Sequence, residues 1–542
     1  MFDFRGFINA LIGKKNGDPV GDLKSATIWV QELPEADIHR AQAEIIKALV
    51  SINDNKKTPL KERIRILLYL DEKARHLQET LCREYLLHAD QAEAQEKFYL
   101  PTILGFWHEM GGAYQICIRS FAESPSNGRI RAQLPLLTAR ALHYAAMQAK
   151  WCYIRYLPVE NSVWRALNRL YRYSEREQFN NVTLTLYPNQ GEATTCMSEY
   201  LQALLLHAAN PESLLPLQID MVDKWLDSWA KSITLETDFR PHRQLYAVNL
   251  SDTKPGKRLR RNMLGEKYRY WGVGLLLVLI NKTIEQLKAG ELPVRLKLGE
   301  DCRLPACLDL IELVAKRWAG QGGTRKHDRQ ANVKVVQVVQ GLMEVLIQLK
   351  PGAAKAVPPP SDGVEYKITA GSGAPPFAQK SSADGELFEP ATEQWMMENE
   401  SLSGYGASLS AQNGNQLRIG ALIGLKPEAK KQFAIGIVRR MHKNTANKVY
   451  VGIQTLTQTP VLVQLHPIEG QGRQGGHLDA IYVPELPQAK IERSLLIAND
   501  AYTRGKLLQL RAQGRAYTVR LQQIFEQSTD YARVSFDVLA KH

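Results

Sequence analysis

Two short polar clusters carry the side chains in this sequence that are best suited to ligand recognition. One is the R-x3-R pattern of Arg325 and Arg329, and the other is the N-x-S-x2-G pattern of Asn399, Ser401 and Gly404. A guanidinium is planar and permanently charged, so it can grip a phosphate or donate a pair of hydrogen bonds to guanine O6 and N7. Two arginines four residues apart can therefore contact different parts of one large anionic ligand.

The second cluster supplies neutral polar contacts. Asn399 can both donate and accept, Ser401 adds a hydroxyl, and Gly404 permits a turn or a close backbone approach. Either cluster alone would often occur by chance, as a solvated arginine pair or an ordinary turn. Their order along the chain, together with the strands around them, favours a binding site.

Strand-like runs surround both clusters, at Val333–Val339 before the second cluster and at Leu417–Leu425, Gln432–Arg439 and Lys448–Leu456 after it. Between the clusters, residues 351–390 contain 23 Pro, Gly, Ser or Ala in 40 positions. Such a segment cannot bury enough apolar surface to offset its ordering entropy. We therefore expect a flexible insertion that interrupts one β-domain.

With these motifs and strands, the sequence resembles the PilZ family of bacterial cyclic di-GMP receptors. The resemblance covers about residues 320–350 and 393–460, and it implies a six-stranded β-barrel that binds cyclic di-GMP. Arg325 and Arg329 would clasp its phosphates and guanine edges, while Asn399 and Ser401 would contact a guanine. The 74 residues from Arg325 to Asn399 exceed the usual spacing, but doubling the length of a loop costs only about 0.6 kcal/mol.

The remaining regions predict a multidomain α+β chain. Apolar residues at helical spacing indicate an N-terminal all-helical domain over 1–232, with helices near 60–81, 95–122, 134–157, 161–178, 193–208 and 211–232. A small α/β connector is expected at 233–317, the PilZ-like barrel at 318–460 and a C-terminal small β-domain at 461–542. The connector should hold a strand at Ile233–Asn249, a buried helix from about Tyr270 to Lys288 and a short strand at Val294–Leu298.

Several local features have a plain structural interpretation. Trp164, Leu167 and Tyr171 match the opening of a tetratricopeptide helix, but a core stripe explains them better. The ten-residue apolar run Trp271–Ile280 is too short for a membrane span and predicts a buried helix. Seven Lys or Arg within 254–269 are expected to form a solvated loop rather than an anion-binding patch.

Composition narrows the class of protein further. The net charge of +13 over 542 residues does not demand a nucleic-acid partner. The six cysteines lack the short paired spacings of a zinc site, and no N-terminal secretory signal is recognisable, so reduced thiols in a cytoplasmic protein are expected. His143 and His207 lie on apolar helical faces and should be packed. For His327, inside the arginine motif, a spacer that points to solvent is as good an explanation as a contact to the ligand. We expect no metal.

Two functional hypotheses follow. The first is a cytoplasmic signalling effector that binds cyclic di-GMP through Arg325, Arg329, Asn399, Ser401 and Gly404 and contacts a protein partner through the helical domain. The second is a non-catalytic helical scaffold with a degenerate barrel that binds protein only. An enzyme finds no support, because no complete zinc-protease, P-loop or nucleophile-elbow motif is present. The pathway, the partner and the ligand stoichiometry stay open.

Overall fold

In the computed structural model of the chain, described residues fall into two compact units. One comprises Met1–Lys326, Ser410–Leu417 and Arg440–Tyr450, and the other His327–Leu409, Arg418–Arg439 and Val451–His542. The structure describes residues 20–34, 36–88, 92–124, 128–188, 192–321, 330–350, 392–401, 403–410, 417–428, 430, 432–444, 446, 448–468 and 477–542. Arg325, His327, Arg329 and the predicted flexible insertion 351–390 lie outside these residues.

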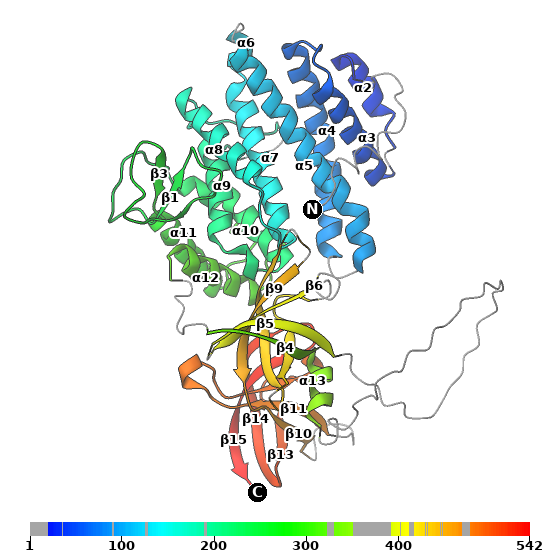
Figure 1. Cartoon of the computed structure of the whole chain (residues 1–542), viewed down its shortest axis with the longest axis vertical. Helices are drawn as coiled ribbons and strands as arrows, with labels where there is room; N and C mark the ends of the chain where they lie inside the picture. Colours follow the sequence, from blue (N-terminus) through cyan, green and yellow to red (C-terminus); the bar gives the residue numbers. More distant parts are fainter. Residues whose placement is uncertain are drawn as a thin grey trace, which may run out of the picture. The chain divides into compact units, whose positions relative to one another are not determined.

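The first unit is mainly helical, as the sequence predicts (Figure 1). Its first helices are α2 (Leu23–Gln31), α3 (Ile38–Asp54), α4 (Leu60–Leu87), α5 (Ala92–Glu123), α6 (Gly128–Arg131), α7 (Leu134–Ile154), α8 (Asn161–Arg176), α9 (Cys196–Ala208) and α10 (Pro216–Trp229), with 3-10 turns at Pro211–Ser213 and Ala230–Ser232. A three-stranded sheet in the order β2-β1-β3 follows, from β1 (Tyr246–Asn249), β2 (Lys257–Arg258) and β3 (Tyr268–Trp271), and then α11 (Gly274–Lys288) and α12 (Ala306–Trp318). None of the described helices is long and apolar enough to cross a bilayer.

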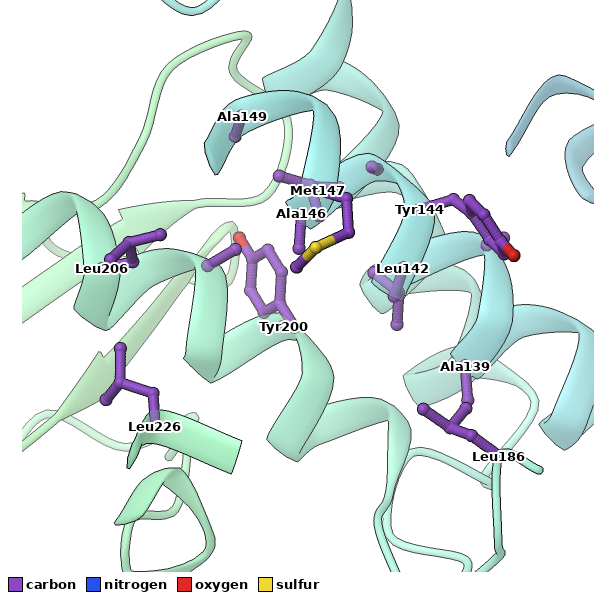
Figure 2. Packing of buried hydrophobic residues seen from close by; sticks show 14 of the residues in the cluster. Ala139, Leu142, Tyr144, Ala146, Met147, Ala149, Leu186, Tyr200, Leu206 and Leu226 are labelled. Atoms are coloured by element: carbon purple, nitrogen blue, oxygen red, sulfur yellow. The ribbon is translucent and has the colours of Figure 1, made fainter. Parts of the chain in front are cut away.

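One continuous apolar core holds this unit together. Figure 2 shows part of this core, where Met147 of α7 lies next to Tyr200 of α9. The same core extends through Trp271 to Trp318 at the end of α12. Residues between 233 and 317 thus contribute to the core of the helices, and Ala247, Met263 and Tyr270 of this segment form a separate small apolar cluster.

Trp164, Leu167 and Tyr171 are each at most 2% exposed, which confirms the predicted core stripe of α8. Burial lowers the pKa of His207 to about 4, and its ring lies 5.5 Å from that of Trp164, so this histidine is packed as predicted.

Two predictions for the segment after residue 232 are wrong, and a third is confirmed only in part. The strand expected over Ile233–Asn249 is confined to β1, and the residues expected to form a strand at Val294–Leu298 form turns instead. The helix expected from about Tyr270 to Lys288 is present as α11, but it is not buried throughout: Leu276 and Ile280 are fully buried, whereas Leu275 is 70% and Val278 67% exposed. Local hydrophobicity shows that a segment is apolar, but only packing decides whether another element covers it.

The expectation of six reduced thiols is also wrong. Cys302 and Cys307 form a disulfide, with Cα atoms 5.1 Å apart, because the turn before α12 folds the chain back on itself. The other four cysteines are free thiols. Burial raises the pKa of Cys117 and of Cys196 to about 12, so these two are protonated at neutral pH.

Two closed six-stranded antiparallel barrels confirm the predicted α+β class. The first has the strand order β4-β5-β6-β9-β8-β7, and the second β10-β11-β12-β15-β14-β13. Their strands are β4 (Gln330–Gln340), β5 (Glu393–Ser401), β6 (Gly404–Ser410), β7 (Leu422–Pro427), β8 (Ala434–Lys443), β9 (Lys448–Thr457), β10 (Val461–Pro467), β11 (Leu478–Val483), β12 (Ser494–Ile497), β13 (Leu507–Ala512), β14 (Arg515–Gln527) and β15 (Ala532–Lys541). A turn at Gln513-Gly514 joins β13 and β14, with both residues at positive φ as a type I′ hairpin requires.

Within the second unit the two barrels share an apolar cluster. The short helix α13 (Leu342–Leu349), which the sequence analysis did not anticipate, contributes Leu342, Val345 and Leu346 to it. Tyr531, fully buried in the turn between β14 and β15, lies in the same cluster and donates to Gly420 O at 3.2 Å. Arg439 of β8 forms a bidentate pair with Glu526 of β14.

Candidate functional site

The site residues that the structure describes lie at the β5–β6 hairpin of the first barrel. β5 ends at Ser401 and β6 begins at Gly404, and these two residues face each other across the ladder. The Ser401 hydroxyl donates to Gly404 O at 3.1 Å and so braces the tight connection. The N-x-S-x2-G motif therefore spans the end of β5 and the start of β6, with its serine paired to its glycine.

Position 404 must be glycine because the backbone of the adjacent strand β9 lies too close to leave room for a Cβ atom. A Cβ at this position would lie 2.1 Å from Ile453 O in the backbone of β9, and no real Cβ tolerates such a contact. The sequence analysis assigned Gly404 to a turn or a close backbone approach, and the structure places it at a close approach within the barrel wall.

Asn399 owes its position to a change of register. The ladder between β5 and β6 shifts between Met397 and Asn399, so that Met397 pairs with Ala407 while Asn399 pairs with Gly406. Residues that are directly opposite in an antiparallel pair share a face. Ala407 and Gly406 are consecutive, so Asn399 lies on the face opposite to the fully buried Met397.

The outer face to which Asn399 belongs carries exposed apolar side chains. Met396 of β5 and Val335 of β4 are paired across the ladder, and each is 38% exposed. The neighbouring pair, Val336 and Trp395, fills the barrel interior and is at most 1% exposed. The face that carries Asn399 therefore also carries, farther along the two strands, a small apolar surface that the flat face of a base could contact.

The side chain of Asn399 fills the space above Gly406. A Cβ at position 406 would lie 2.5 Å from Asn399 Oδ1 and 2.8 Å from Nδ2. The Oδ1 atom is buried, and no donor among the described residues reaches it. Buried carbonyl oxygens are normally hydrogen-bonded, so this one is suited to accept from a bound molecule.

Glu400, between the two motif residues, points the other way. It pairs with Tyr405, and its carboxylate lies 3.2 Å from Lys334 Nζ of β4. Burial raises the pKa of Tyr405, whose hydroxyl accepts from Gln458 Nε2 at 2.6 Å. Glu400 therefore ties β4 to β5 beside the site and leaves the outer face to Asn399 and Ser401.

The arginine motif cannot be placed directly, because 322–329 lie outside the described residues. The register of β4 nevertheless fixes where that motif joins the barrel. Gln330, the residue next to Arg329, pairs with Glu400, and Ala331 pairs with Asn399. β4 therefore begins beside Asn399. The residue that precedes β4 in the chain is Arg329, the last residue of the arginine motif.

Sequence analysis missed two contributors to this geometry. Gly406 could have been noticed as the second glycine of the G-x-G string that begins at Gly404. The apolar pair Val335 and Met396 carries no sequence signal, because strand pairing alone brings it together. Among the described residues, no cluster of three or more His, Cys, Asp or Glu could hold a metal ion.

Comparison with protein-family models finds three matches in chain order. Residues 24–242 match the N-terminal domain of the cyclic-di-GMP receptor FimW, residues 362–460 its middle PilZ domain and residues 463–539 its C-terminal β-barrel domain. Together these ranges span almost three quarters of the chain. The PilZ match contains Asn399, Ser401 and Gly404 but begins after the arginine motif. No curated protein and no solved structure matches the chain.

Proposed function

The chain belongs to the FimW family of cyclic-di-GMP receptors, and we propose that it binds cyclic di-GMP on the outer face of its first barrel and acts as a cytoplasmic signalling effector. The proposed contacts are Arg325 and Arg329 to phosphate and guanine, and Asn399 and Ser401 to a guanine edge. Gly404 permits the close approach of β6 to β9 beside these residues. The family is one of receptors, and we assign no catalytic role to the chain.

The register of β4 against β5 is the observation that carries this proposal. Gln330 pairs with Glu400, so β4 begins beside the N-x-S-x2-G motif, and Arg329 is the residue joined covalently to that end of β4. This supports a shared site even though 74 residues separate Arg325 from Asn399 in sequence. The unsatisfied Asn399 Oδ1 and the apolar pair Val335 and Met396 add a polar and an apolar contact on the same face. Recognition of a purine base needs both a polar contact to its edge and an apolar contact to its face.

Calorimetric titration of the full chain with cyclic di-GMP tests the proposal and gives affinity and stoichiometry together. Asn399→Ala should weaken binding about tenfold, because a hydrogen-bonding group of the ligand would lose its partner. Gln394→Ala is the matched control, since Gln394 is an exposed amide on the same strand away from the site. A chain that gives no heat with cyclic di-GMP would favour the alternative hypothesis, a scaffold whose barrel binds protein only.

We further propose that occupancy of the site is passed to a protein partner through the helical unit. The support is the anchoring of α12, whose Trp318 Nε1 donates to Leu205 O at 2.9 Å and whose Arg317 Nη1 donates to Ala209 O at 2.7 Å. Only six residues separate Trp318 from Arg325 in sequence. A change in the arginine segment therefore has a short covalent path to a helix fixed in the core.

Hydrogen exchange of residues 304–330 with and without cyclic di-GMP tests this transmission. A ligand shifts a conformational equilibrium only through differential affinity, so added protection of α12 should be absent in Arg329→Ala. Protection confined to 325–329 and 399–404 would refute transmission while leaving ligand binding intact.

A further inference from the structure

Helix α8 presents a stripe of arginines to solvent. Arg165, Arg169, Arg172 and Arg176 are exposed and follow one another at spacings of four, three and four residues. This spacing places all four on one face of a helix, over about 16 Å of its length. The opposite face of α8 is held in the core by Trp164, Leu167, Leu170 and Tyr171.

The basic segment after β1 adjoins this stripe. Asn168 Nδ2 donates to Asp252 O at 3.0 Å and to Lys254 O at 3.2 Å, and Arg172 Nη1 donates to Ser251 Oγ at 3.3 Å. Residues 250–269 contribute seven Lys or Arg, of which six are exposed. Together α8 and this segment hold eleven basic against three acidic residues, an excess of eight in a chain whose net charge is +13.

Much of this charge is not neutralised within the described residues. Arg269 is bound by Glu175, at 2.7 Å and 2.5 Å, and Arg176 lies 3.3 Å from Glu177. For Arg165, Arg169 and Arg172 no carboxylate of the described residues lies within ion-pair distance. Three guanidinium groups are thus presented in a row on a rigid helix, ready for an external anion.

We propose that this surface docks an acidic amphipathic helix of a partner protein. Carboxylates on such a helix recur one turn apart, which is the spacing of the arginines, and guanidinium groups bind carboxylates bidentately. The apolar face of α8 is buried, so it has nothing to insert into a bilayer. Glu160 and Glu177 bracket the stripe at the two ends of α8, which suits a short acidic segment better than a long polyphosphate chain.

A pair of labelled peptides of about 20 residues tests the proposal against the full chain without cyclic di-GMP. In one peptide four glutamates follow the i, i+4, i+7, i+11 pattern on a helical alanine background, and in the other the same residues are spread over all faces. Fluorescence anisotropy should show tighter binding of the striped peptide, and raising the ionic strength from about 0.05 M to 0.5 M should abolish it.

The triple variant Arg165→Gln, Arg169→Gln, Arg172→Gln should weaken binding of the striped peptide about tenfold, since each exposed pair contributes only modestly. Glutamine keeps the helix, and circular dichroism checks this. The control Lys56→Gln, Lys57→Gln, Lys61→Gln removes the same charge from another exposed part of the unit and should leave affinity unchanged.

Equal binding of both peptides, or equal loss in the control, would overturn the proposal, because affinity would then follow net charge alone. Preferential binding of a 20-base-pair duplex or of phosphatidylserine vesicles that is lost in the arginine variant would equally overturn it, in favour of a nucleic acid or a membrane. None of these outcomes depends on the cyclic di-GMP site, so the two proposals fail independently.

Discussion

The amide of Asn399 occupies the space that any side chain at Gly406 would need. The two residues are direct partners across the β5–β6 ladder, and a Cβ at Gly406 would lie 2.5 Å from Asn399 Oδ1. The absence of a side chain at Gly406 therefore permits the observed position of Asn399, the proposed base-reading residue.

Gly406→Ala should consequently lower the affinity for cyclic di-GMP, because the new methyl group displaces the Asn399 amide. We expect a loss of about tenfold, comparable to removal of one hydrogen bond to the ligand. Calorimetric titration gives the affinity. Gly274→Ala, the same change where a Cβ would meet nothing within 4 Å, should have no effect. Full affinity in Gly406→Ala would show that the position of Asn399 is irrelevant to binding.

Arg325→Ala and Arg329→Ala should each weaken cyclic di-GMP binding by about 10- to 100-fold, since a lost charge-assisted hydrogen bond costs about 1.5 to 3 kcal/mol. Thermal stability should hardly change. Lys326→Ala removes one positive charge from the same segment and separates specific contacts from net charge. If all three variants bind like the parent chain, the arginine motif is not part of the site.

Replacement of residues 351–390 by a short Gly/Ser linker should leave folding and ligand affinity nearly intact, because lengthening or shortening a flexible loop changes closure entropy only slowly. A 40-residue Gly/Ser segment serves as the length control. Since the PilZ family model already matches from residue 362, loss of soluble protein in both variants would show that specific residues of this segment belong to the fold.

Tyr531→Ala should destabilise both barrels together. Tyr531 is fully buried in the cluster that the barrels share, and large-to-small changes at such sites cost about 3 to 5 kcal/mol. Hydrogen exchange of β7 and β12 should then rise in parallel. Faster exchange in the second barrel alone would mean that the shared cluster does not couple them.

The helical unit should lose stability between about pH 6.5 and pH 4, in part through His207. Burial lowers the folded-state pKa of His207 to about 4, below its unfolded value near 6.5, so protons bind the unfolded chain first and favour unfolding as the pH falls. His207→Gln should flatten this part of a plot of denaturation midpoint against pH. An unchanged slope would show that His207 does not contribute.

Much of the architecture could be predicted from local pattern. The helical period marked α4, α5 and α7 through α9 to within a few residues at most ends. Thr58 and Pro59 predict an N-cap followed by the first helical residue. Helix α4 instead begins at Leu60, with Pro59 at the N-cap position and no side-chain cap. These elements are predictable because the apolar residues that form the buried face of each element lie close together in the sequence, at a regular spacing.

The tertiary structure alone decided what depends on distant partners. Cys302 and Cys307 bond because a turn brings them together, and the apolar start of α11 stays exposed because no described element covers Leu275 or Val278. The sequence by itself determined the residue types of the proposed site and the family resemblance, since each motif consists of a few residues that are close together in the chain. Which face Asn399 occupies was decided by a register shift against β6, because pairing between strands, and not the order of residues within one strand, sets the side to which a side chain points.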